Sequence, residues 1–75
     1  MDRSTLQAQL GLVDRGLAEA NAEVSRMRKR IAELRRDRRD TGFAQEALAL
    51  CLVTHSVLET RREIILIELE ALIIA

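Results

Sequence analysis

Eight basic residues between positions 26 and 39 carry the strongest functional signal in this 75-residue chain. This basic block consists of Arg26, Arg28, Lys29, Arg30, Arg35, Arg36, Arg38 and Arg39. Phosphate groups favour such a density of positive charge, because each neutralised phosphate releases condensed counterions. Two features argue against a nucleic-acid site: no aromatic residues interleave with the block, and no base-reading helix motif accompanies it.

Three interpretations of the basic block therefore stay open. It is a solvated or salt-bridged helix face, a contact for an acidic protein partner, or a nucleic-acid site. Of these we favour the first. If nucleic acid or an acidic partner binds, we expect the contacts to come from Arg28, Lys29, Arg35 and Arg36.

His55 is the only histidine, and Glu59 follows it one helical turn later. A histidine followed by polar residues on an exposed helix face accepts phosphate in the dimeric hairpins of sensor kinases. His55, however, falls on the apolar seam of its expected helix, and no Gly-rich nucleotide loop accompanies it. We therefore expect a partly buried histidine that is hydrogen-bonded to Glu59 or to a group of the neighbouring helix.

Cys51 stands between Leu50 and Leu52. A catalytic thiol needs a cationic neighbour and access to solvent, so apolar surroundings favour a buried, space-filling role instead. One cysteine and one histidine are also too few for a structural zinc site, and we expect no metal and no cofactor. A lone free thiol fits a reducing cytoplasm.

Glu19, Glu23, Glu59 and Arg62 form a further candidate cluster. Paired carboxylates can perform acid–base chemistry, but a thin pair of helices offers no pocket for a substrate. We expect a polar layer that fixes the register between helices, and no enzymatic activity.

The composition is typical of long helices. The chain has no Pro, Trp or Tyr and a single Phe. Its longest apolar runs, 47–53 and 71–75, fall short of the ~20 residues that span a bilayer, and the first residues lack the layout of a signal peptide. The sequence predicts one domain over residues 1–75, cytoplasmic and without membrane contact.

A heptad pattern defines the first helix. Core positions recur without any charged residue at Leu6, Leu10, Val13, Leu17, Ala20, Val24, Met27, Ile31 and Leu34. Such a narrow apolar seam must face another helix. We expect this helix to run from about residue 4 to 39, capped by Ser4 or Thr5.

The break follows at residues 40–42. Asp40 or Thr41 can cap a second helix over about 43–74, and Gly42 supplies the backbone freedom for a tight reversal. So short a connection makes the two helices antiparallel neighbours. The sequence therefore predicts an all-α fold, an antiparallel two-helix hairpin resembling a coiled coil.

The second helix carries a matching seam. Its members are Ala44, Leu48, Cys51, His55, Leu58, Arg62, Ile65, Leu69 and Leu72. Folding the chain about Thr41 sets Arg62 opposite Ala20, where it would pair with Glu19 or Glu23. The same fold-back sets Leu48 against Leu34, Cys51 against Ile31, Leu58 against Val24 and Ile65 against Leu17.

A further pattern covers roughly the second half of the chain. It runs Arg36-Asp37-Arg38-Arg39-Asp40-Thr41-Gly42-Phe43-Ala44, then Leu48, Arg62-Glu63, Ile65-Leu66 and Glu68-Leu69. These residues resemble a group of short uncharacterised helical-hairpin proteins of rhizobia and related alphaproteobacteria. The resemblance implies a bacterial, cytoplasmic helical hairpin and brings no known activity.

The second helix is more apolar than one seam requires, and a helix that is apolar on most of its circumference belongs in an interior. We therefore expect a homodimer that forms a four-helix bundle with the second helices inside. Its interface should contain Phe43, Leu50, Val53, Val57, Ile64, Ile67 and Ile74.

These patterns favour a non-enzymatic interaction or regulatory module that acts through the helical surfaces of a dimeric bundle. The alternative is a nucleic-acid-binding bundle that uses residues 26–39. Histidine phosphotransfer, or another enzymatic role, ranks third.

Overall fold

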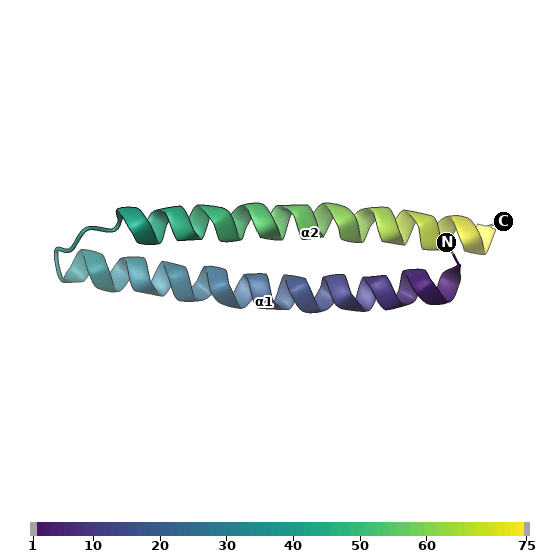
Figure 1. Ribbon diagram of the computed structural model, residues 1–75, viewed down its shortest axis with the longest axis horizontal. Helices are drawn as coiled ribbons and strands as arrows, with labels where there is room; N and C mark the ends of the chain where they lie inside the picture. Colours follow the sequence, from purple (N-terminus) through teal and green to yellow (C-terminus); the bar gives the residue numbers. More distant parts are fainter. Residues whose placement is uncertain (1, 75) are drawn as a thin grey trace.

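The computed structural model describes residues 2–74, which form two long helices, α1 (Arg3–Arg36) and α2 (Gly42–Ile74). The helices lie side by side and antiparallel along their whole lengths, with both chain ends at one end of the molecule (Figure 1). The hairpin measures 59 × 14 × 14 Å. The predicted all-α hairpin is confirmed. Over residues 2–74, neither helix has the length and apolar character needed to cross a membrane.

The first helix begins one or two residues earlier than expected. The side chain of Asp2 is its N-cap, and Asp2 Oδ1 accepts a 2.7 Å hydrogen bond from the backbone N–H of Thr5. This bond lowers the pKa of the Asp2 carboxyl. The predicted caps Ser4 and Thr5 instead lie inside the helix, because Asp caps as well as Ser or Thr and precedes both.

The first helix also ends earlier than expected, at Arg36. The backbone N–H of Arg39 donates to the carbonyl of Leu34 at 2.8 Å, and that of Arg38 donates to Arg35 at 3.1 Å. This pair of bonds is a Schellman motif, which requires one residue in the left-handed conformation. Arg38 adopts it with φ 56°, whereas Gly42 has no positive φ. The prediction that Gly42 supplies the backbone freedom is wrong.

The second helix begins as the sequence predicted, at residues able to cap it. Asp40 Oδ1 accepts from the backbone N–H of Gly42 at 2.9 Å. The carbonyl of Thr41 accepts from the N–H of Gln45 at 2.8 Å, and the Gln45 side-chain amide donates to the Thr41 hydroxyl at 3.0 Å. These bonds start α2 directly after a short connection.

The register between the helices differs from the prediction. The connection spans residues 37–41 and centres on Arg39, not Thr41. Arg62 contacts Asp14 instead of lying opposite Ala20, a shift of six residues, or nearly two helical turns, towards the start of α1. Ile65 is accordingly buried with Leu6 and Val13. Leu58 lies over the backbone of Gly16. The predicted pairings about Thr41 are therefore wrong by six to eight residues, or about two turns.

Both seams are confirmed as the core. All nine seam residues of α1 are buried or half-buried, with Leu6 the most enclosed at 1 % exposed. On α2 the seam is buried or half-buried from Ala44 to Leu69. Leu72 is 44 % exposed, because α1 begins at Arg3 and little of it extends beyond this position.

Candidate interaction interface

Large apolar side chains stand in solvent along one face of α2. This apolar stripe consists of the seven predicted interface residues Phe43, Leu50, Val53, Val57, Ile64, Ile67 and Ile74, whose exposed fractions run from 51 % for Ile64 to 88 % for Phe43. Each stripe residue either precedes a seam residue by one position or follows one by two. At roughly 100° per residue, the stripe therefore lies roughly 100–160° around α2 from the seam.

One residue of α1 extends this surface. Leu12 is 64 % exposed and borders a hollow of about 700 Å³ between the helices, together with Val57 and Ile64. The sequence analysis missed Leu12, because a single apolar residue off the heptad seam gives no periodic signal. Leu12 and the stripe are on the same side of the hairpin.

A second hollow, of about 570 Å³, continues along the same side. Glu19, Glu23 and Arg26 of α1 line it opposite Leu50. Arg26 is ion-paired with Glu23. This side of the hairpin thus combines an apolar stripe on α2 with a polar edge on α1, which is the usual anatomy of a protein interface.

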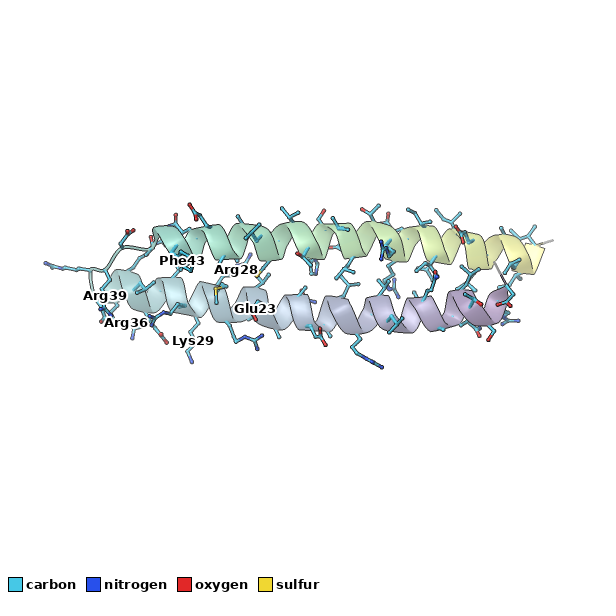
Figure 2. All side chains as sticks on the ribbon, viewed as in Figure 1. Glu23, Arg28, Lys29, Arg36, Arg39 and Phe43 are labelled. Atoms are coloured by element: carbon cyan, nitrogen blue, oxygen red, sulfur yellow. The ribbon has the colours of Figure 1, made fainter. Side chains whose placement is uncertain are left out.

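The basic block lies at the turn end of the molecule. Figure 2 labels four of its members there, with Phe43 close by. Arg26 pairs with Glu23, and Arg30 lies 3.9 Å from Glu33. Among residues 2–74, the others have no acidic partner within ion-pair distance, namely Arg28, Lys29, Arg35, Arg36, Arg38 and Arg39.

The four predicted phosphate-contacting residues are all exposed. Arg28 and Arg35 line a third hollow of about 400 Å³, in which Gln45 and Leu48 of α2 face them. Two arginines seven residues apart on one helix are two turns apart, and both can approach the same anionic chain. These exposed side chains are therefore accessible to an anionic ligand.

His55 takes the environment that the sequence predicted. Its side chain is 24 % exposed, and Nδ1 lies 2.5 Å from Oε1 of Glu59. Cys51 is a half-buried free thiol beside Leu50 and Thr54, which is less enclosed than expected. Among the described residues, no three His, Cys, Asp or Glu side chains gather closely enough to hold a metal ion.

The predicted polar layer does not form. Arg62 Nε donates to Asp14 Oδ1 at 2.7 Å instead of pairing with Glu19 or Glu23. Glu23 holds Arg26 and Glu59 holds His55. The shift in register explains the change, because it carries Arg62 nearly two turns towards the start of α1, from Ala20 to Asp14. Asp14 could have been found only with the correct pivot.

The chain matches no protein-family model, no curated protein and no solved structure.

Proposed function

We propose that this chain is a small, non-enzymatic interaction or regulatory module that assembles with a second copy into a four-helix bundle. One observation carries the proposal. The apolar stripe leaves seven large side chains exposed on one face of α2, each more than half exposed. Contiguous apolar surface of this kind marks interaction sites in soluble proteins.

The energetics favour assembly. Burying one large apolar side chain fully contributes ~1.5–3 kcal/mol, and a single core in a chain of this length seldom supplies more than ~3–5 kcal/mol. The free energy gained by burying the stripe is therefore at least as large as the unfolding free energy of the isolated hairpin. Folding and assembly then behave as one equilibrium, and the stability depends on protein concentration.

Sedimentation equilibrium on paired variants tests the proposal. Leu50→Asp and Ile67→Asp each place a charge within the stripe, and both should yield monomers that have lost much of their helical circular dichroism. Leu52→Asp is the matched control, because Leu52 is 44 % exposed and lies about 200° around α2 from Leu50. It should keep the dimer. Equal dissociation by all three variants would contradict an interface centred on the stripe.

Polyanion binding at the turn end is a second candidate function. The exposed arginines that lack acidic partners favour it, because a solvated face stabilised by ion pairs would pair them as it pairs Arg26 and Arg30. Long-range attraction of this kind weakens as salt is added.

An electrophoretic mobility shift with single-stranded RNA at ~50 and ~200 mM salt tests the second candidate, since log affinity falls by ~0.7–0.9 per contacted phosphate per unit log salt. Arg28→Glu with Arg35→Glu should weaken binding and flatten the salt slope. Arg3→Glu with Arg15→Glu, at the opposite end, is the charge-matched control. No shift of the wild-type protein at the lower salt would leave the block as a solvated face.

A further inference from the structure

We infer that the second copy lies antiparallel, with a two-fold axis that crosses α2 between Leu58 and Glu59. This inference rests on the proposed assembly through the apolar stripe and specifies its geometry. In this arrangement Phe43, Leu50 and Val53 of one chain pack against the partner's Ile74, the partner's Ile67 and the partner's Ile64.

The spacing of the stripe is symmetric about that axis. Leu50 and Ile67 lie equally far from the midpoint between Leu58 and Glu59, and so do Val53 and Ile64. Phe43 and Ile74, the two ends of the stripe, obey the same rule. A two-fold axis at the midpoint therefore superimposes the stripe of one chain on that of its partner, as an isologous interface requires.

The stripe follows the 3,4 spacing of a second heptad seam of α2, and the two polar residues of that seam also fit this arrangement. Glu46 and Thr60 fall in the gaps of the 3,4 spacing, and the axis places them opposite the partner's Ala71 and the partner's Val57. A long polar side chain thus faces the smallest residue of the seam, which lets the glutamate reach solvent. A parallel pairing would set Glu46 against its own copy, and like charges in one layer destabilise a coiled coil.

The edges of the stripe favour the same orientation. Glu63 and Glu70 follow one edge of the stripe, where the antiparallel register brings them nearest the partner's Ser56 and the partner's Ala49. In antiparallel coiled coils, these edge residues interact with the equivalent edge of the partner, so repulsion between edges selects the orientation. No two acidic residues meet along this edge.

The charge of the two ends favours it as well. Residues 26–39 carry a net charge of +6, whereas residues 40–75 carry −4, with most of their acidic residues towards the open end. Antiparallel chains bring each basic turn end beside the acidic open end of the partner. Parallel chains would place the two basic blocks at the same end of the assembly, where their like charges repel.

Disulfide trapping with two different chains tests the orientation. Both chains carry Cys51→Ala. One also carries Val53→Cys and an affinity tag, and the other carries Ile64→Cys. After mixing and mild oxidation, antiparallel packing predicts the mixed disulfide as the main product. Two copies of position 53 would be about 11 residues, or ~16 Å, apart along the axis, and cysteines more than ~7 Å apart at Cα do not bridge.

The outcomes separate this inference from the proposal beneath it. Sedimentation of the same reduced chains reports whether a dimer exists. A dimer that yields mainly the 53–53 and 64–64 disulfides keeps the assembly and overturns the antiparallel orientation. A dimer that yields no disulfide overturns the residue pairing, and a folded monomer overturns the assembly itself. Leu52→Cys, on the other side of α2, measures the background of random collision and should give little product.

Discussion

The two helices of this hairpin have nearly equal lengths but expose very different amounts of apolar surface. On α1 the seam faces α2 and nearly everything else is polar, with Leu12 as its one exposed large apolar residue among those described. On α2 an equivalent seam faces α1, and among the described residues ten large apolar side chains outside that seam stand exposed. The hairpin buries nearly all the large apolar side chains of α1 but leaves many of those on α2 exposed. The exposed apolar surface of α2 therefore indicates that a further packing partner covers this helix.

The largest expected effect separates the seam of α2 from its stripe. Ile65 is 4 % exposed and lies in the core with Leu6 and Val13, so Ile65→Ala should cost about 2–5 kcal/mol of unfolding free energy. Its neighbour Ile64 is 51 % exposed, and Ile64→Ala should act mainly by weakening assembly. Urea unfolding at two protein concentrations distinguishes them.

If both isoleucine variants show the same loss at high dilution, the distinction between seam and stripe fails. In that case α2 would be enclosed on both sides within the single hairpin.

A smaller effect concerns the two glycines inside α1. Gly11 has open space around the position of a Cβ, so Gly11→Ala should stabilise the protein by about 1 kcal/mol through helix propensity. A Cβ on Gly16 would lie 3.2 Å from Leu58 Cδ1, so Gly16→Ala should gain less, because the leucine methyl must move. Thermal unfolding measures both. Equal gains would contradict the close approach of α2 at Gly16.

The ion pair between the helices should have a lesser effect still. Asp14 and Arg62 are each close to half exposed, and exposed pairs contribute ~0.2–1 kcal/mol. A double-mutant cycle with Asp14→Ala and Arg62→Ala should give a coupling free energy in that range. A second cycle, with Glu19→Ala and Arg62→Ala, should give none. Coupling to Glu19 would restore the register that pivots on Thr41.

The smallest expected effect lies at the N-cap of α1. The bond from the Thr5 N–H lowers the pKa of Asp2, so the charged cap stabilises the helix fully above about pH 4. That contribution is lost as the pH falls through the lower, folded-state pKa. An NMR titration of the Thr5 amide should show a midpoint below the ordinary value for aspartate. A midpoint at the ordinary value would mean that Asp2 does not cap.

Much of the fold could be predicted from the sequence, because heptad spacing constrains both helices at once. The heptad spacing predicted the individual seam residues of α1 and α2. The apolar residues outside the α2 seam predicted the exposed stripe. The register between the helices could not be predicted in this way, because it depends on the residue at which α1 ends. A Schellman turn with Arg38 in a left-handed conformation has no sequence signal comparable to glycine. One misplaced pivot then misassigned Arg62.

A dilution series on the wild-type protein tests the central claim most directly. Molar mass by light scattering and helical circular dichroism are followed together from about 100 µM downwards. Mutual coverage of the apolar stripe predicts a mass near twice the 8.5 kDa of one chain at the high end. It also predicts that mass and helicity fall together on dilution, because assembly and folding are coupled. A fully helical monomer of 8.5 kDa throughout the series would contradict it.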